Sequence, residues 1–247
     1  MSNAEIKSTE QEIILPRHVA ITPDGNRRWA KNNGKSNIEG HEEGTRVFKK
    51  ILKHASARNV EYVSMWGMSL DNFVKRNPAE VAGLLNLFRK EFKDLANDED
   101  IHRNKVHVNV LGRWQEKFPF PVRGAVQEAI DATKDYSKLF LNIFLAYSGT
   151  DEMLQAVRTI AEKAKDAKSK LLITPELLKQ SLFTKDLPPV DLLIRTGGEP
   201  HLSAGFMMWD CADSQLFFTE KYWPDFTTGD FDEALAEYAT RGRRFGK

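Results

Sequence analysis

The chain has little cysteine and no long apolar run. Cys211 is the only cysteine among 247 residues, so an internal disulfide is excluded, and neither a CxxC pair nor the cysteine and histidine spacing typical of zinc sites occurs. No stretch of about 18 consecutive apolar residues is present that could span a bilayer. With 41% hydrophobic and 29% charged residues, the composition is that of a globular protein, and we expect it to work in a reducing cytoplasm.

An excess of positive charge is also missing. The sequence has 36 lysines and arginines against 35 aspartates and glutamates, for a formal net charge of +1. It therefore lacks the broad positive field that supports nonspecific binding to nucleic acids, and we expect no nucleic-acid partner. Any site for an anion has to be local.

Short apolar runs that alternate with amphipathic stretches indicate an α/β fold. The runs typical of strands are Ile13–Ile21, Tyr62–Ser69, Val106–Leu111, Phe140–Tyr147, Leu192–Arg195 and Phe206–Trp209. The clearest helix has apolar residues every three or four positions from Val81 to Leu95. Two others are expected after a cap at Thr150 and from Thr174-Pro175.

This alternation predicts a mainly parallel central sheet with helices on both faces. We expect a single domain over residues 13–247. Residues 1–12, MSNAEIKSTEQE, are polar and lack the charged and then apolar pattern of a secretion signal. They are expected to form a flexible N-terminal segment, part of it left from cloning.

The first predicted strand ends in a cluster of polar residues, HVAITPDGNRRW, that admits three interpretations. The first is a simple turn, because Asp24-Gly25 is a sequence that favours turns. The second is a phosphatase that forms an aspartyl-phosphate, but Thr22 stands where the nucleophilic aspartate belongs. The third is a site in which Asp24 holds Mg²⁺ while backbone N–H groups and guanidiniums bind phosphate oxygens.

Two further loops favour the third interpretation. DLLIRTGGEPHLS places Arg195 at the end of a predicted strand, next to two glycines, and MSLDNFVKR offers Ser69, Asn72 and Arg76 after another strand. Ligands of open parallel sheets lie beyond the carboxyl ends of the strands. The three loops are therefore expected to face one crevice.

Taken together and in this order, the motifs resemble those of the cis-prenyltransferases, the undecaprenyl diphosphate synthase family. The similar segments are HVAITPDGNRRWA, NIEGHEEG, SLDNFVKR, DLLIRTGGEPHLS, FFTEKYWPDF and RGRRFG, which extend from about His18 to Gly246. The resemblance implies Mg²⁺-dependent condensation of isopentenyl diphosphate with an allylic diphosphate such as farnesyl diphosphate, with a cis double bond made at each addition. It also implies an apolar tunnel between the sheet and the helices.

The resemblance further assigns roles to particular residues. Asp24 is expected to act with Mg²⁺ on the diphosphates. The residues expected around the allylic diphosphate are Gly25, Asn26, Arg27, Arg28, Trp29, His41 and Arg76, and Ser69 and Phe73 complete the expected substrate-binding set. Those expected in the isopentenyl diphosphate pocket are Arg195, His201 and Ser203, with the Arg244–Gly246 tail reaching across from a second subunit.

Asn72 matches the position often assigned as the proton acceptor from the incoming isopentenyl unit. A neutral amide is a poor base, so our hypothesis is that Asn72 orients the substrate while a diphosphate oxygen takes the proton.

Four positions depart from the usual family pattern. Arg27 replaces a common glycine, Asn37 and His201 replace arginines, and Gln215 stands in place of a glutamate that the family uses as a second metal-linked acid. An amide oxygen binds Mg²⁺ more weakly than a carboxylate does. Asp213, expected to share a strand face with Gln215, is a candidate substitute.

These departures keep a second class of function open, a non-catalytic family member that serves as a binding or accessory subunit of a partner synthase. The intact Asp24-Gly25-Asn26 turn favours the enzyme, and a plain phosphate-ester hydrolase lacks a nucleophile and base. From the family we also expect a homodimer, formed near the C-terminal third of the chain, and peripheral membrane contact for product release. Product length and the preferred allylic substrate do not follow from the sequence.

Overall fold

Six strands form one parallel sheet in the computed structural model, which describes residues 15–166 and 170–241. The strands are β1 (His18–Thr22), β2 (Tyr62–Ser69), β3 (Val106–Leu111), β4 (Leu139–Tyr147), β5 (Leu192–Arg195) and β6 (Gln215–Phe218). Their order is β3-β4-β2-β1-β5-β6, and every neighbouring pair is parallel. The strands β1 and β5 are therefore adjacent, although Leu192 lies 174 positions after His18 in the sequence.

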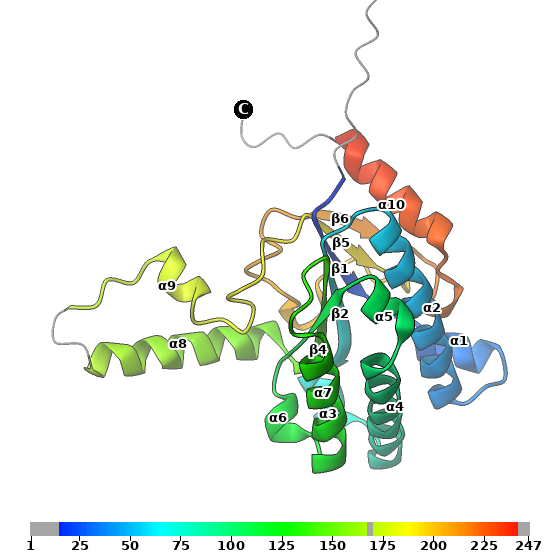
Figure 1. Ribbon diagram of the computed structural model, residues 1–247, viewed down its shortest axis with the longest axis horizontal. Coiled ribbons are helices and arrows are strands. Elements are labelled where there is room, and N and C mark those ends of the chain that lie inside the picture. The colour runs from blue at the N-terminus through cyan, green and yellow to red at the C-terminus, as the bar shows by residue number, and fades with distance from the viewer. Residues whose placement is uncertain (1–14, 167–169, 242–247) are drawn as a thin grey trace, which may run out of the picture.

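The α-helices of the described residues lie between and around these strands (Figure 1). They are α1 (Asn26–Asn32), α2 (Asn37–Ala57), α3 (Leu70–Lys75), α4 (Pro78–Ala96), α5 (Glu99–Arg103), α6 (Trp114–Lys117), α7 (Phe120–Thr133), α8 (Gly149–Asp166), α9 (Pro175–Lys179) and α10 (Thr228–Arg241). Short 3₁₀ turns occupy Ser203–Gly205 and Trp223–Asp225.

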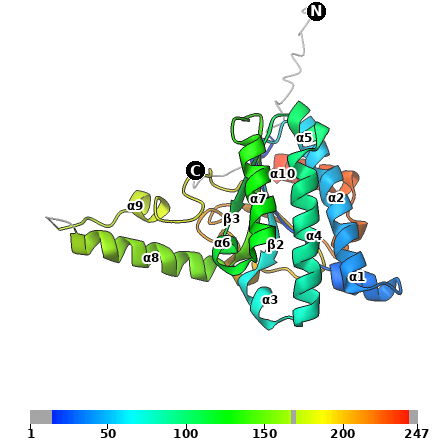
Figure 2. The same ribbon diagram turned by 60° about the horizontal axis from the view of Figure 1, so that its bottom comes forward.

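The two faces of the sheet are covered differently. On one face, α2 and α10 pack over β1, β2 and β5 through residues such as Ile51 and Phe231, and α4 and α7 complete the layer. In Figure 2, α2 and α4 run side by side on this face. The opposite face is covered by two segments that follow α9, residues 183–190 and 206–211. The α/β class and the mainly parallel sheet predicted from the sequence are confirmed.

Helix starts follow the expected local chemistry. Ser36 forms a capping box with Glu39 at the start of α2, and Thr174 accepts a hydrogen bond from the N–H of Leu177 before Pro175 opens α9. Asn77 caps α4 in the same way. The helix predicted over Val81–Leu95 is therefore confirmed, with slightly wider bounds.

The strand predicted at Phe206–Trp209 is wrong. Phe206 and Met207 are fully buried, but they form a turn in which Met207 has a φ of 48°, and the sixth strand begins later, at Gln215. A short apolar run is equally consistent with a strand and with a buried turn when periodicity is the only guide. Asp213, expected on that strand, lies in the turn before β6.

Within residues 15–166 and 170–241, no helix combines the length and the apolar character needed to cross a bilayer.

A buried histidine lies at the start of β1. His18 is 0% exposed; its Nδ1 lies 2.9 Å from the carbonyl oxygen of Pro188, and its Nε2 lies 2.8 Å from Oγ of Ser64. A carbonyl only accepts, so Nδ1 carries the proton and the Ser64 hydroxyl donates to Nε2. Burial is the main reason that the pKa of His18 is lowered to about 4.

The lowered pKa of His18 predicts a loss of stability in mild acid. Below pH 6.5, the ordinary pKa of histidine, His18 is protonated in the unfolded chain but stays neutral in the folded chain. The free energy of unfolding should therefore fall as the pH drops from 6.5 towards 4. The expected loss from this residue is about 3 kcal/mol. Urea unfolding at a series of pH values measures it. His18→Gln should show a shallower pH dependence than the wild type, and an unchanged slope would contradict the assignment.

Candidate active site

A cavity of about 850 Å³ opens at the carboxyl ends of the central strands and continues beneath α2 and α4. Its polar mouth is lined by Asp24, Gly25, Asn26, Arg27, Arg28, His41, Ser69, Asn72, Arg76, Arg195, Glu199 and Ser203. The three loops singled out in the sequence thus meet at one crevice, as expected for a parallel sheet.

Asp24 stands at the centre of this mouth because of the register between β1 and β5. Thr22 pairs with Arg195, so the residues that follow the two strands are neighbours. Oδ2 of Asp24 accepts a hydrogen bond from Nη2 of Arg195 at 3.0 Å, and Nη2 of Arg28 lies 3.3 Å from Oδ1. One carboxylate is therefore flanked by two guanidiniums, one of them buried and one half-exposed.

Thr196 fixes the backbone of Asp24, a role that the sequence did not suggest. Its hydroxyl accepts from the N–H of Asp24 at 2.9 Å and donates to the carbonyl of the same residue at 2.8 Å. The only signal was its place in the RTGG motif. Because the side chain is fully buried, it holds the aspartate relative to β5.

Position 25 requires glycine, both because of its backbone conformation and because Tyr222 lies close to it. Gly25 adopts a φ of 101° at the N-terminus of α1, and a Cβ there would lie 2.6 Å from Cδ1 of Tyr222. A side chain at this position would therefore displace the turn that presents Asp24.

The basic residues at the mouth are partly desolvated. Burial is the main cause that lowers the pKa of Arg76, and Arg27 adds to the effect. Burial also lowers the pKa of His41 to about 4, with contributions from Arg76 and Arg27, so His41 is neutral at pH 7. Like charges gathered this closely indicate a site arranged for an anion.

Several buried polar atoms at the mouth have no hydrogen-bond partner among the described residues. They are Oδ1 of Asn26, Nε2 of His41, Nε of Arg76 and Nε of Arg195. Buried polar groups are normally paired. Their grouping here is the pattern expected of a site completed by a polar ligand.

The SLDN loop supplies the third side of the crevice. Ser69 ends β2 and caps α3, where its Oγ accepts from the N–H of Asn72 at 2.9 Å. Ser69 and Asn72 both line the cavity. Asp71 is paired with Lys75 at 2.6 Å.

Three predicted substrate-binding side chains do not line the cavity. Trp29 points to the other side of α1, where its Nε1 donates to Oδ1 of Asp225 at 2.7 Å. Phe73 packs against Phe118 with ring centroids 5.7 Å apart and is partly buried against the core that includes α4 and α7. The side chain of His201 is exposed, and only its carbonyl takes part, as an acceptor from Nη1 of Arg195 at 2.5 Å.

Gln215, proposed from the family pattern as a doubtful metal ligand, lies at the wrong end of the sheet for that role within one chain. It pairs with Leu192 at the start of β5, whereas Asp24 follows the strand ends. Leu192 and Arg195 are three residues apart on β5, so the level of Gln215 and the strand ends near Asp24 are separated by about 10 Å along the sheet. Its Nε2 lies 3.5 Å from the carbonyl of Tyr238 in α10. The Arg244–Gly246 tail, expected to reach a partner subunit, lies outside the described residues.

Away from the mouth, the cavity becomes apolar. The helices α2 and α4 contribute Phe48, Leu52, Leu84, Leu87, Phe88, Phe92 and Leu95, and Met65, Ile101 and Ile143 lie among the other lining residues. An ion pair of 2.7 Å between Lys49 and Glu91 joins the two helices along this wall. The predicted apolar tunnel between sheet and helices is therefore present, and Gly67 of β2 is among its lining residues.

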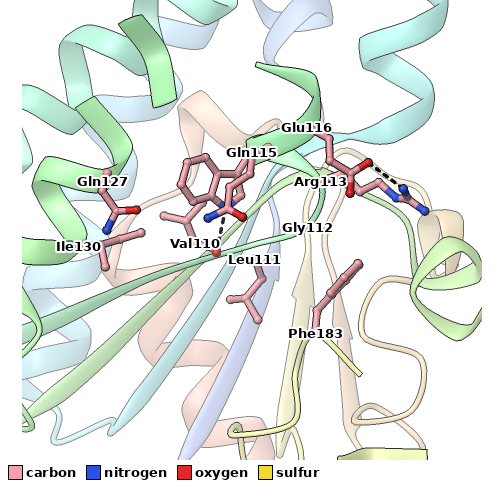
Figure 3. Close-up of a pocket in the computed structure, with 10 residues that line it drawn as sticks. Val110, Leu111, Gly112, Arg113, Gln115, Glu116, Gln127, Ile130 and Phe183 are labelled. Carbon is pink, nitrogen blue, oxygen red and sulfur yellow. Dashed lines mark hydrogen bonds and ion pairs between the residues drawn. The ribbon is translucent and has the colours of Figure 1, made fainter. Parts of the chain in front are cut away.

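A second pocket, of about 440 Å³, shares no lining residue with the first (Figure 3). Its guanidinium, Arg113, is already paired with Asp151 at 2.6 Å and with Glu116 at 2.9 Å. Nε1 of Trp114 donates to the carbonyl of Val110 at the edge of the sheet. With its cation neutralised, this pocket lacks the anion-binding character of the first.

Comparison with known proteins agrees with the geometry of the first cavity. The family model for undecaprenyl diphosphate synthase matches residues 22–246. The chain belongs to this family of cis-prenyltransferases. It is 42% identical over 234 residues to the tritrans,polycis-undecaprenyl-diphosphate synthase (geranylgeranyl-diphosphate specific) of Thermococcus kodakarensis, covering 94% of this chain and 88% of that one.

Two further relatives extend the comparison. The ditrans,polycis-undecaprenyl-diphosphate synthase ((2E,6E)-farnesyl-diphosphate specific) of Coxiella burnetii is 41% identical, with 94% of this chain and 97% of that one covered. The crystal structure of lavandulyl diphosphate synthase from Lavandula x intermedia, in complex with dimethylallyl diphosphate, is 30% identical with a TM-score of 0.86 and covers 94% and 99% of the two chains. This cis-prenyltransferase is accordingly a prenyl-transferring enzyme, and the accessory-subunit alternative is not favoured.

Proposed function

We propose that this cis-prenyltransferase condenses isopentenyl diphosphate with an allylic diphosphate and lengthens the product by cis additions. The observation that carries the proposal is the position of Asp24, between Arg195 and Arg28 at the mouth of an apolar cavity. A diphosphate headgroup needs the polar mouth, and a growing hydrocarbon chain needs the apolar remainder.

The chemistry explains the residue types. The C–O bond of the allylic substrate breaks, the leaving diphosphate takes the electron pair, a C–C bond forms to the isopentenyl unit, and that unit loses a proton. Arginines held in place before the reaction stabilise the charge that develops on the leaving oxygen. Arg27, Arg28 and Arg76 are assigned to the allylic diphosphate, with His41 as a neutral donor or acceptor, and Arg195 and Ser203 to the isopentenyl diphosphate.

Asn72 is assigned to orientation of the isopentenyl unit. Its side chain belongs to the cavity lining, and an amide has no basic lone pair suited to abstracting a carbon-bound proton. A diphosphate oxygen is the better acceptor in this arrangement.

The residues present suit Mg²⁺ only when substrate is bound. No group of three or more histidine, cysteine, aspartate or glutamate side chains within residues 15–166 and 170–241 is placed to hold a metal ion. Magnesium, however, commonly uses one or two carboxylates together with substrate phosphates and water. Asp24 is the carboxylate that would hold it here, and the ion, when bound, supplies positive charge to the diphosphate oxygens. We propose no role for Gln215 at this site.

The allylic substrate is proposed from the relatives. The names of the Coxiella and Thermococcus proteins specify farnesyl and geranylgeranyl diphosphate, respectively. We propose that this chain uses a primer of the same class, acts in the cytoplasm and contacts a membrane peripherally when the apolar product leaves.

The experiment that tests the proposed function is an incubation with Mg²⁺, labelled isopentenyl diphosphate and one of three primers: dimethylallyl, farnesyl or geranylgeranyl diphosphate. Products are separated by chain length. Labelled products longer than the primer support the proposal. No product with any primer, despite binding of a diphosphate, would favour the accessory-subunit function instead.

We also propose that the enzyme is a homodimer formed through α8. This helix extends away from the sheet (Figures 1 and 2), and Leu154 and Val157 on its outer side are each 56% exposed. Ala161 and Ala164 continue the stripe at helical spacing. Self-complementary apolar stripes of this kind suit a two-fold interface between identical chains. This places the proposed interface before the C-terminal third named from the sequence.

The dimer proposal predicts that charge on the stripe separates the subunits. Leu154→Asp combined with Val157→Asp should convert a dimer to a monomer in size-exclusion chromatography with light scattering, because the two carboxylates added to each subunit would face those of the other across the axis. Val74→Asp, a change at an apolar residue of α3 that is 69% exposed, serves as the matched control and should stay dimeric. A wild type that is monomeric at micromolar concentration would refute the proposal.

A further inference from the structure

A buried polar network lies where β4 passes into α8. Tyr147, the last residue of β4, and Glu152, in the first turn of α8, are 0% and 2% exposed. The Tyr147 hydroxyl donates to Oε2 of Glu152 at 2.5 Å, and the N–H of Thr184 donates to Oε1 at 3.1 Å. A buried carboxylate is costly unless it is hydrogen-bonded in this way.

The network reaches the loop that carries Ser203. The N–H of Met207 donates to the Tyr147 hydroxyl at 3.2 Å, across 60 residues of sequence. The hydroxyl therefore accepts from the loop and donates to Glu152, so all three groups depend on one oxygen. The Tyr147 ring is separately packed edge-on against Phe144 and Phe206.

The loop itself is strained. Ala204 has a φ of 45° and Met207 a φ of 48°, both in the left-handed region, and Gly205 between them has a φ of 64°. Non-glycine residues hold this conformation only when their surroundings enforce it. The start of α8 presses directly on the loop, since a Cβ at Gly149 would overlap the carbonyl oxygen of Gly205.

The loop is held at two points with the substrate-facing residue between them. On one side, Nη1 of Arg195 donates to the carbonyl of His201 at 2.5 Å. On the other, the N–H of Met207 is bound by Tyr147. Ser203 and Ala204 lie between these anchors and line the main cavity. The second anchor stands outside the cavity lining, so it can affect a substrate in the cavity only through the loop that it holds.

We propose that Tyr147 and Glu152 are positioning residues that set Ser203 for binding of isopentenyl diphosphate, the non-allylic substrate. The inference rests on the proposed function for the identity of that substrate. Without the hydroxyl, the N–H of Met207 loses its partner and the strained turn relaxes, which moves Ser203 but leaves Asp24, Arg28 and Arg76 in place. The effect should therefore fall on one substrate and not on the other.

Tyr147→Phe tests this proposal because it removes the hydroxyl and keeps the ring. The dissociation constant for isopentenyl diphosphate, measured by calorimetry with Mg²⁺ and no allylic primer, is expected to rise about tenfold, the size of one lost hydrogen bond. In turnover, the KM for isopentenyl diphosphate should rise similarly, while the KM for the allylic primer changes less than about twofold. Glu152→Gln, which keeps one acceptor oxygen, should give a smaller rise with the same selectivity.

Tyr62→Phe is the matched control, since Tyr62 is stacked on Phe140 outside the cavity lining. It should leave both substrates unaffected. Unchanged affinity for isopentenyl diphosphate in Tyr147→Phe would overturn the inference, as would equal weakening of both substrates together with a lowered Tm, which marks a purely structural role.

Calorimetry also separates this inference from the proposed function. A wild type that binds isopentenyl diphosphate without turning it over refutes the proposed condensation, yet the comparison with Tyr147→Phe still decides the positioning role. A wild type that does not bind isopentenyl diphosphate at all overturns both.

Discussion

Asp24→Asn is expected to lower kcat/KM for condensation by roughly 10³-fold, the largest effect of any single conservative change in the mouth of the cavity. The amide keeps the shape of the side chain but removes the charge that opposes Arg195 and Arg28 and that would hold Mg²⁺. The measurement is incorporation of labelled isopentenyl diphosphate over a range of Mg²⁺ concentrations.

The control for Asp24→Asn is Asp186→Asn, at an exposed aspartate outside the cavity, which should retain full activity. Circular dichroism and thermal unfolding of both variants separate lost chemistry from lost folding, because Arg195 remains buried without its carboxylate in the first variant. Activity of Asp24→Asn within about tenfold of the wild type would show that the arginines and the substrate suffice.

Arg195→Lys is expected to lower kcat/KM by about 10²-fold while the chain stays folded. The guanidinium is 4% exposed and makes two bonds in different directions, to Oδ2 of Asp24 and to the carbonyl of His201. An ammonium keeps the charge but cannot fork between both partners. The aspartate and the loop of Ser203 would then lose their common support.

Steady-state kinetics with each substrate varied in turn measure the effect of Arg195→Lys. Arg17→Lys, in an exposed ion pair with Glu61, is the matched control and should change kcat/KM less than twofold. Equal activity in the two lysine variants would mean that the charge of Arg195 matters and its forked geometry does not.

The coupling of Asp24 to Arg195 shows how the parallel sheet produces the site. The two residues are 171 positions apart in the sequence. Pairing of Thr22 with Arg195 places the ends of β1 and β5 at the same level, and Thr196 then fixes the aspartate's backbone from both sides. Neither strand alone would present the carboxylate to a guanidinium.

Much of the fold followed from the sequence because local patterns and tertiary structure agreed. The bounds of β2, β3 and β5 match the predicted runs, and the apolar spacing of Val81–Leu95 gave the helix that forms one cavity wall. The apolar run at Phe206–Trp209 gave a wrong prediction because it is buried in a strained turn and not by pairing in the sheet. The ring of Phe206 stacks on that of Trp66, with centroids 5.3 Å apart.

The sequence predicted which loops converge at the candidate site more reliably than it predicted where their side chains point. Asp24, Arg28 and Arg195 converge as expected, but Trp29 is turned away by the helical rotation of α1, and Phe73 by that of α3. Family spacing alone placed Gln215 beside the metal, whereas the register of β6 puts it at the opposite end of the sheet. Such directions depend on three-dimensional contacts that a linear motif does not contain.

The measurement that tests the central claim most directly is the geometry of the double bond formed in the first condensation. The purified enzyme is given farnesyl diphosphate, Mg²⁺ and ¹³C-labelled isopentenyl diphosphate, and the product is examined by NMR. A new bond in the cis configuration, formed by the wild type and lost with Asp24→Asn, is the predicted result. A trans bond, or equal product from the variant, would contradict the account.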